Sequence, residues 1–510
     1  MHVHLPKKER NKTKKHIFGI EHSTNFIYHI LVQKTILVIK LVKLTFYGGV
    51  NEIGGNKILL KDRDTQIFID FGMSFSRRNK FFEEFLTPRS ANGIGDFITM
   101  GLIPDINGIY RDDLLEHYGR KPEDPEIQGV LLSHAHADHA NYISFLHKDI
   151  PIYCGETCKY LLEAIEEQSQ RNIENEVLNY KKRPVYRDEY RKPPIERNFY
   201  TFRTGDKIKI DSLEIEPVHV DHSVPGAYGF IIHTSQGSVI YTGDLRMHGL
   251  HAEMTGDFIE KAKENKPIAM ITEGTRIDVG TTNESEQKVY KESIKNIKGN
   301  KKLSIVDFNF KDVDRFTTFY NIAKQLNKKL VISFKHACFL EKYHKDKKLK
   351  TPDSQDENIL LLKPKRLTGT YIDEDYTDWY IKKRLKYKNI ITAEEIVKKP
   401  DAYVVVLNFY YFNMLVDLKP YDGVYIHSLS EPFNEEMEVS YDRMMNWIKF
   451  FKLRFVQAHC SGHITGDDLR KLIKTIKPKK LYPIHTEHPD LFKKLNIHTN
   501  IVEEGKTYTV

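Results

Sequence analysis

Residues 133–139 read Ser-His-Ala-His-Ala-Asp-His, and this heptad constrains the fold more than any other segment of the chain. It follows directly on the apolar run Gly129–Leu132, which predicts a buried strand with the heptad at its end. Burying three imidazoles without partners would be costly, whereas imidazole and carboxylate together are the ligands of zinc-type divalent ions. The alternative is a chance histidine-rich loop, which has no need of three histidines. The heptad therefore predicts a metal site.

Bulk composition narrows the class of protein. The chain has 510 residues, of which 40% are hydrophobic and 29% charged, so we expect two or three domains with large cores. The formal net charge of +8 suits a polyanionic partner without requiring one. The four cysteines are too few for a disulfide framework and indicate a reducing compartment. Lysines interrupt the most apolar early stretch, and no signal peptide is evident, so we expect a cytoplasmic protein with no membrane partner.

Secondary-structure patterns divide the chain into four segments. Residues 1–43 precede the first clear strand, and the sequence leaves open whether they are an extension of unknown role or a gene-start artefact. Paired short strands predict a sandwich over residues 44–280, and alternating helices and apolar strands predict a parallel α/β domain over 281–452. The first pattern returns over 453–510. Residues 180–198, rich in Lys, Arg, Tyr and Pro, are interpreted as a solvated basic loop, with an RNA-facing patch as the alternative.

The remaining ligands of a two-metal site should come from other strand ends. His222 follows a strand-like stretch, Asp244 ends Val-Ile-Tyr-Thr-Gly-Asp, and His485 ends Leu-Tyr-Pro-Ile-His. Each alone is typical of an ordinary turn or strand end. In this order behind the heptad they predict the rest of a metal site, in which an acid such as Asp244 can bridge two cations.

These residues, taken in order, resemble the metallo-β-lactamase superfamily. The heptad, His222 and Asp244 match its ordered metal motifs, and Asp70 matches the acid that ends an early strand. The gap between Asp244 and His485 is far longer than a plain member needs, and the α/β segment fills it. The resemblance implies an αββα metallo-β-lactamase sandwich with an inserted α/β domain, a combination of α+β and α/β architecture.

The insertion resembles the β-CASP branch of that superfamily, which processes nucleic acids. Glu273, His463 and His485 match its three additional motifs. The run from Ala458 to His488 is most similar to ribonuclease J, although Thr486-Glu487 stands where Gly-Glu is common. In length the chain looks like the archaeal type, without the C-terminal domain of the bacterial forms.

The resemblance also implies a set of site residues. Two zinc ions per chain would be held by two groups that share Asp244. The first group is His134, His136, His222 and Asp244, and the second is Asp138, His139, Asp244 and His485. Asp138 would also orient the attacking water. Asp70 would hold a metal-binding histidine through its other ring nitrogen.

The remaining implied residues handle the substrate. His463 would be the general acid, with Glu273 raising its pKa and fixing its orientation. The alternative for Glu273 is a strand-end salt bridge with Arg276. Phosphate contacts would come from the His459 imidazole, the Ser461 hydroxyl and the Gly462 backbone.

The predicted function is a zinc-dependent ribonuclease that hydrolyses phosphodiester bonds of single-stranded RNA in the 5′-to-3′ direction, with endonuclease action left open. One alternative is a DNA-processing β-CASP nuclease; His485 argues against it, because DNA-repair members typically carry valine there. The other is a non-catalytic RNA-binding scaffold subunit. The sequence leaves open whether the chain forms a homodimer.

Overall fold

The computed structural model describes residues 41–83, 85–183, 192–432 and 435–510. Residues Val42–Val510 form one compact unit. Nearly all of the predicted extension over residues 1–43, and the centre of the basic segment 180–198, therefore lie outside the described residues. Within the described ranges, no helix is both long enough and apolar enough to cross a bilayer.

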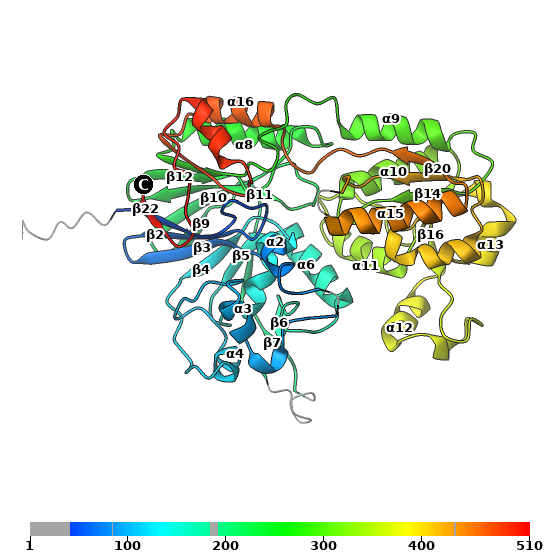
Figure 1. Cartoon of the computed structure of the whole chain (residues 1–510), viewed down its shortest axis with the longest axis horizontal. Coiled ribbons are helices and arrows are strands. Elements are labelled where there is room, and N and C mark those ends of the chain that lie inside the picture. The colour runs from blue at the N-terminus through cyan, green and yellow to red at the C-terminus, as the bar shows by residue number, and fades with distance from the viewer. Residues whose placement is uncertain (1–40, 84, 184–191, 433–434) are drawn as a thin grey trace, which may run out of the picture. The chain divides into compact units, whose positions relative to one another are not determined.

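The first sheet mixes antiparallel and parallel pairing. β1 (Lys43–Gly48), β2 (Lys57–Asp62) and β3 (Thr65–Phe71) form an antiparallel meander, and β3 then pairs in parallel with β4 (Gly129–Leu132). β5 (Ile152–Gly155) and β8 (Phe199–Phe202) continue the parallel part, while β22 (Thr507–Thr509) pairs with β1 at the other edge. The C-terminal end of the chain thus completes the sheet that its first described strands begin (Figure 1).

The second sheet packs face to face against the first. Its strand order is β21 (Lys480–Pro483), β13 (Ala269–Thr272), β12 (Gly237–Tyr241), β11 (Tyr228–Thr234), β10 (Leu213–His219) and β9 (Ile208–Ile210). Alternating apolar residues from both sheets form one buried cluster that includes Ile69, Phe230 and Tyr482. Such alternation is what a strand needs when one of its faces is buried.

Helices cover the two outer faces of this sandwich. α8 (Ala252–Glu264) and α16 (Gly466–Ile476) bury Phe258 and Leu472 against the second sheet. α6 (Glu156–Gln168) packs Leu161 and Leu162 on the side of the first sheet, together with the short helices α3 (Gly95–Thr99) and α4 (Asp112–His117). The predicted αββα sandwich is confirmed (Figure 1).

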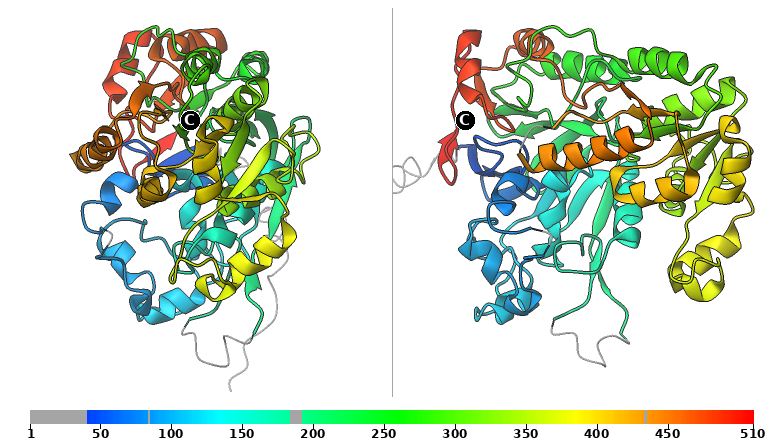
Figure 2. Two further views of the ribbon diagram at one scale, coloured as in Figure 1. Left: turned by 90° about the vertical axis from the view of Figure 1, so that its right-hand side faces the viewer. Right: turned by 45° about the vertical axis from the view of Figure 1, so that its right-hand side comes forward.

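A third sheet, wholly parallel in its pairings, lies between the two halves of the sandwich in sequence. Its strand order is β17 (Ile390–Thr392), β16 (Ile359–Lys363), β15 (Lys329–Ile332), β18 (Tyr403–Val406), β14 (Ser304–Asp307), β19 (Val424–His427) and β20 (Arg454–Gln457). α10 (Val313–Gln325) and α11 (Phe334–Tyr343) cover one face, and α13 (Ala393–Lys398) and α15 (Glu435–Phe450) cover the other. Figure 2 shows this green-to-orange segment from two further sides, and the inserted α/β architecture is confirmed.

The structure differs from the predicted element boundaries at several points. β20 was assigned to the return segment 453–510, but it pairs in parallel with β19, so the inserted sheet continues to Gln457. The predicted helix over residues 160–179 begins at Glu156 and ends at Gln168. α8 and α11 were not predicted at all. An apolar strand has the same local pattern in either sheet, so only long-range pairing decides where β20 belongs.

Candidate metal centre

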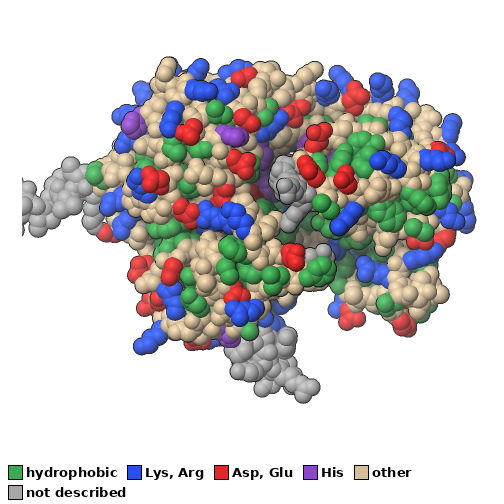
Figure 3. Space-filling view, in the orientation of Figure 1, with side chains coloured by type: hydrophobic (Ala, Val, Ile, Leu, Met, Phe, Trp, Pro, Cys, Tyr) green, Lys and Arg blue, Asp and Glu red, His purple; other side chains and the backbone are tan. Residues whose placement is uncertain are grey.

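Six strand ends bring the predicted ligands to one edge of the sandwich. β3 ends at Phe71, directly after Asp70, and β4 leads into the heptad through Ser133. β10, β12, β13 and β21 each lead within a few residues to one more site residue, in turn His222, Asp244, Glu273 and His485. Figure 3 shows histidine side chains gathered in a hollow near the centre of that face.

Within the heptad, a strand end and one helical turn separate the side chains. His136 is the N-cap of the short helix α5 (Ala137–Ala140), with extended backbone at φ −69° and ψ 148°. His134 and His136 precede the turn, while Asp138 and His139 lie within it. The change of backbone conformation therefore directs the two pairs to two neighbouring groups of ligands.

The first ligand group consists of three histidines beside Asp244. His136 Nδ1 lies 3.1 Å from His134 Nε2 and 3.1 Å from His222 Nε2. Asp244 Oδ2 lies 3.7 Å from His134 Nε2 and 3.9 Å from His222 Nε2. The four ligand atoms fall within 4.8 Å of one another, a spacing that suits one ion among them.

The second group lies on the other side of Asp244. Asp138 Oδ2 lies 3.3 Å from His485 Nε2 and 3.9 Å from His139 Nε2. Asp244 Oδ2 is 3.2 Å from His139 Nε2 and 3.6 Å from His485 Nε2. One carboxylate oxygen thus borders both groups, the arrangement expected of an acid shared by two cations.

Unsatisfied buried atoms show that this donor set fits a cation. Neither Nε2 of His139 nor Oδ1 of Asp244 makes a hydrogen bond to any described residue, although both atoms are buried. Buried polar atoms without partners are rare, because each costs roughly 1–3 kcal/mol. Burial also lowers the pKa of His134 and of His222 well below the usual range, which keeps both imidazoles neutral and able to bind a metal.

The ring nitrogen of His139 that points away from the ligand group is held by polar side chains behind it. Asp70 Oδ2 lies 2.7 Å from His139 Nδ1, and Asp70 Oδ1 accepts the Ser133 N–H at 2.7 Å. The Tyr241 hydroxyl donates to Asp70 Oδ2 at 2.5 Å. These contacts fix which ring nitrogen of His139 faces the site. Asp70 is a residue that the sequence pointed to, whereas nothing in the local sequence pointed to Tyr241.

His485 and His222 are oriented in the same way. Thr275 Oγ1 lies 2.8 Å from His485 Nδ1, and the Gly462 carbonyl lies 2.6 Å from His222 Nδ1. His485 and Asp70 also share left-handed backbone, with φ of 50° and 57°. Non-glycine residues adopt this conformation infrequently and at some energetic cost, often at functional sites.

Glu273 and His463 form a buried pair beside both ligand groups. Glu273 Oε2 lies 2.9 Å from His463 Nδ1, and Glu273 Oε1 accepts the Leu245 N–H at 2.9 Å. Burial alone would lower the pKa of His463, but Glu273 and Asp244 outweigh it and raise the pKa to about 9. The alternative of a salt bridge between Glu273 and Arg276 is wrong, because Arg276 pairs with Glu284.

The loop of residues 459–463 is held by side chains from the inserted domain. Arg315, on α10, donates to the Ser428 and Cys460 carbonyls at 2.7 and 3.3 Å and lies 3.3 Å from His459 Nδ1. The Ser461 N–H donates to Glu284 at 2.9 Å. The Ser461 hydroxyl accepts the His463 N–H at 3.1 Å, so its own hydrogen stays available for another acceptor. Sequence reasoning missed Arg315, which lies far from every motif.

Burial changes the expected behaviour of His459. Its pKa falls to about 4, first because of burial and then because of the Arg315 charge. The imidazole is therefore neutral at physiological pH, and it can contact phosphate only as a neutral hydrogen-bond donor.

Comparisons with known proteins agree with this architecture. A β-lactamase superfamily domain matches residues 109–263, and a Zn-dependent metallo-hydrolase RNA specificity domain matches residues 451–497. Ribonuclease J of Helicobacter pylori (strain B128) is 23% identical over 474 residues, which cover 88% of this chain and 56% of that relative. The chain thus spans about half the length of that relative. Ribonuclease J of Pyrococcus abyssi is 22% identical over 481 residues, 91% of this chain and 93% of the relative.

A solved structure shares the whole fold. The crystal structure of a protein of unknown function from Enterococcus faecalis V583 superposes with a TM-score of 0.70 at 24% identity. It covers 92% of this chain and 100% of its own. The two domain matches stand at the expected positions and the relatives extend along about nine-tenths of the chain, which supports the recognition of this protein as similar to the ribonuclease J members of the β-CASP branch of the metallo-β-lactamase superfamily.

Proposed function

We propose that this chain is a metal-dependent ribonuclease that uses two zinc ions to hydrolyse phosphodiester bonds of single-stranded RNA. The observation that carries the proposal is the shared position of Asp244 between two ligand groups, with the Glu273–His463 pair beside it. A monometallic or purely structural site would need neither the second group nor the pair. The match to an RNA specificity domain over residues 451–497 supports RNA as the substrate.

The chain's own residues suggest how the reaction would be divided. When bound, two divalent ions would activate water and stabilise charge on the phosphate. His134, His136 and His222 would hold one ion, and Asp138, His139 and His485 the other, with Asp244 shared. Asp138, facing the second group, would orient the attacking water. Tyr241 would keep His139 in place through Asp70, and Thr275 would keep His485 in place directly.

His463 is suited to protonate the leaving oxygen. Its Nδ1 is occupied by Glu273, so only Nε2 can donate to a substrate atom. Its ring centroid lies 5.3 Å from that of His222 and 5.5 Å from that of His485, beside both ligand groups. Burial lowers the pKa of His463, but Glu273 outweighs burial and helps raise the pKa to about 9. His463 therefore carries its proton at neutral pH.

Further parts of the proposal concern the rest of the protein. We place the sandwich at residues 44–280 and 458–510 and the inserted domain at 281–457, because β20 pairs with β19 of the inserted sheet. Cleavage in the 5′-to-3′ direction, additional endonuclease action, a cytoplasmic location and a homodimer stay predictions.

The test uses matched oligonucleotides. Purified protein is incubated with end-labelled RNA carrying a 5′-monophosphate or a 5′-triphosphate, and with DNA of the same sequence. We expect RNA to be cut, chelator to stop the reaction and zinc to restore it, with the product ladder giving the direction. Preference for DNA would favour the DNA-processing alternative. A native protein that lacks metal and binds RNA without cutting it would favour the scaffold.

A further inference from the structure

A histidine of the sandwich, outside every predicted motif, also holds the loop that carries His463, and no part of the mechanism above uses it. His248 follows Asp244 by four positions. Its Nε2 lies 2.8 Å from the Ser461 carbonyl oxygen. Because a carbonyl can only accept, Nε2 carries the hydrogen and donates it. The backbone of His248 is itself fixed, since its carbonyl accepts the Glu286 N–H at 3.1 Å.

The hydrogen bond from His248 fixes the orientation of one peptide group. The Ser461 carbonyl and the Gly462 N–H belong to the same planar unit, in which they point in opposite directions. With the carbonyl held by His248, the Gly462 N–H points away from His248. It makes no hydrogen bond to any residue that the structure describes. Gly462 is partly exposed, so its N–H is a donor that a ligand can use.

The peptide groups on either side are held as well. Toward the N-terminus, the Ser461 N–H donates to Glu284 at 2.9 Å. Toward the C-terminus, the Gly462 carbonyl oxygen lies 2.6 Å from His222 Nδ1. Because His222 is a metal-ligand candidate, this contact also places Gly462 beside the first ligand group. Three successive peptide groups therefore have fixed orientations, and the middle one depends on His248.

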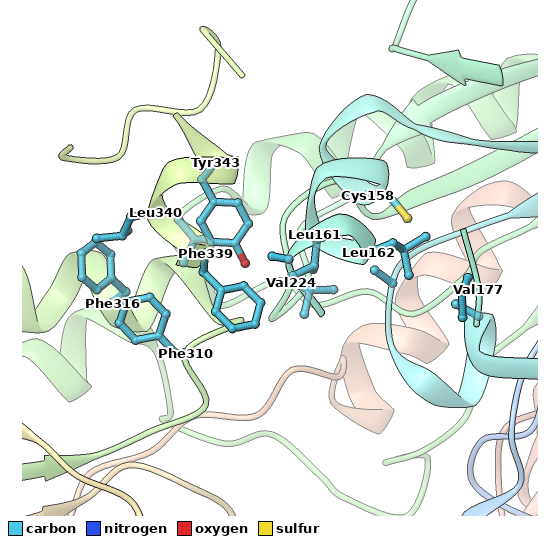
Figure 4. Close-up of a cluster of buried hydrophobic side chains, with 14 of the residues drawn as sticks. Cys158, Leu161, Leu162, Val177, Val224, Phe310, Phe316, Phe339, Leu340 and Tyr343 are labelled. Carbon is cyan, nitrogen blue, oxygen red and sulfur yellow. The ribbon is translucent and has the colours of Figure 1, made fainter. Parts of the chain in front are cut away.

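The space around Gly462 admits no side chain. A Cβ atom at that position would lie 2.7 Å from Ser223 Oγ and 3.3 Å from His222 Cε1. The next residue along that loop, Val224, is buried beside Leu161 of α6 in an apolar core that the sandwich shares with the inserted domain (Figure 4). The loop therefore has little room to shift, and the backbone amide is the one group that Gly462 can offer to a ligand.

We propose that His248 is a positioning residue: by holding the Ser461 carbonyl, it aims the Gly462 N–H at a non-bridging oxygen of the substrate phosphate. This inference rests on the proposed nuclease function. Negative charge builds up on the phosphate oxygens during hydrolysis, and a donor whose direction is fixed in advance stabilises that charge without having to reorganise. His248 acts through the peptide group rather than by contact with the substrate.

The first test compares His248→Phe, which keeps a ring but loses the donor, with His248→Gln, whose amide can reach the same carbonyl. The matched control is His251→Gln, at an exposed histidine of the same segment. We expect His248→Phe to lower kcat for RNA by about 10- to 100-fold with little change in KM, because a donor to the developing charge is misaligned rather than removed. His248→Gln should recover most of the loss. Zinc content should match the wild type in all three variants.

A binding measurement gives a readout independent of turnover. Zinc-loaded protein is titrated with inorganic phosphate in a calorimeter. The Kd for phosphate should rise about three- to tenfold in His248→Phe, the effect of one hydrogen bond, and return close to the wild-type value in His248→Gln. A purely structural role would lower the melting temperature and leave the phosphate affinity of the folded protein unchanged. Should His248→Phe fold poorly, His248→Asn takes its place, because its amide is a methylene too short to reach the carbonyl.

Sulfur substitution identifies the phosphate oxygen. The RNA carries a phosphorothioate of one configuration at the scissile bond, and the two diastereomers are assayed separately. Sulfur is a poor hydrogen-bond acceptor, so for one diastereomer the slowing should be larger in the wild type than in His248→Phe. Equal slowing of wild type and variant by both diastereomers would contradict a contact at the scissile phosphate.

The outcomes separate this inference from the proposed function. An active wild type with His248→Phe unchanged in both kcat and phosphate affinity overturns the His248 inference alone. Zinc loss in both His248→Phe and His248→Gln overturns it too, because the residue would then support the metal ligands instead. A wild type whose phosphate affinity depends on His248 but which cuts no RNA overturns the proposed function.

Discussion

Glu273 and His463 meet across 2.9 Å although 190 positions separate them in the chain. The Glu273 carboxylate cannot turn away, because its other oxygen accepts the Leu245 N–H at 2.9 Å. Leu245 directly follows Asp244, so a single peptide group links the acid shared by the ligand groups to the acid that holds the histidine. The orientation of His463 is therefore set by the same segment that supplies Asp244.

Replacing Glu273 by glutamine should shift the pH profile of the enzyme. The Glu273 charge opposes burial and helps raise the pKa of His463 to about 9. Without that charge the pKa falls, and a general acid works only below its pKa, so the alkaline limb of kcat should move to lower pH. We expect kcat at pH 8 to fall by about 10- to 100-fold with unchanged zinc content. An alkaline limb that stays in place would contradict the pairing.

Removing a metal ligand should abolish activity without unfolding the protein. His136→Ala and Asp138→Asn should each abolish RNA hydrolysis and lower zinc content, because each removes one ligand from a group that the structure brings within 4.8 Å. Circular dichroism should stay that of the wild type, since neither side chain belongs to the apolar core. Full activity in either variant would rule out the two-metal mechanism.

Tyr241→Phe tests the polar layer behind His139. The change removes only the hydroxyl that donates to Asp70 at 2.5 Å and accepts from Asn56 Nδ2 at 3.2 Å. Loss of such a supporting contact typically weakens metal binding by about 10- to 100-fold. Zinc affinity is measured by competition with a chromophoric chelator. The control is Tyr228→Phe, at a neighbouring buried tyrosine. A change that adds a hydroxyl to the core, such as Phe230→Tyr, would overpack it.

Arg315→Lys tests the support of the loop at 459–463. Lysine keeps the charge but cannot reach Glu286, Ser428 and Cys460 together, as the guanidinium does at 2.7–3.3 Å. We expect KM for RNA to rise several-fold while zinc content stays constant. Arg315→Met would instead leave Glu286 buried and unpaired, at a cost of about 3–5 kcal/mol in stability. A kcat and KM both equal to the wild type in Arg315→Lys would contradict this role.

Asp307 predicts a pH-dependent stability of the inserted domain. Burial raises its pKa to about 7, even though its carboxylate accepts the Tyr425 hydroxyl at 2.7 Å. A raised carboxyl pKa means that the folded state holds the proton more tightly, so stability should fall as pH rises from about 4 to about 7 and then level off. Asp307→Asn should remove this slope and stabilise the protein at pH 8 by at most about 4 kcal/mol. Thermal unfolding between pH 5 and 8 measures both effects.

The sequence predicted the parts of the site that follow strand ends. The metal-ligand candidates stand within a few residues of the end of an apolar run, and a strand end is visible in the local pattern. The same is true of Glu273, which directly follows β13, and of Asp70 near the end of β3. The three-sheet architecture was also predictable, because the change from paired strands to helix–strand alternation is a property of the sequence itself.

Other features depend on contacts that no local pattern contains. Tyr241, Thr275 and Arg315 are ordinary residues of a strand, a loop and a helix until the fold brings them to the site. β20 could not be assigned to a sheet from the sequence, because its sheet depends on pairing with β19. In that pairing Arg454 lies beside Val424, which is thirty positions earlier in the chain. Local propensity is a weak guide wherever tertiary pairing decides.

The left-handed backbone at His485 limits how this site can be altered. At a φ of 50°, histidine is among the tolerated residue types, but a β-branched side chain there would be a steric outlier. Exchanging His485 for valine would therefore force the backbone at residue 485 to rotate. The rotation would displace the hydrogen bond from the Thr275 hydroxyl to the carbonyl of that residue and the N–H bond to the Gly49 carbonyl. A protein engineer who wishes to convert this centre toward the valine type would need to graft the surrounding turn together with the side chain.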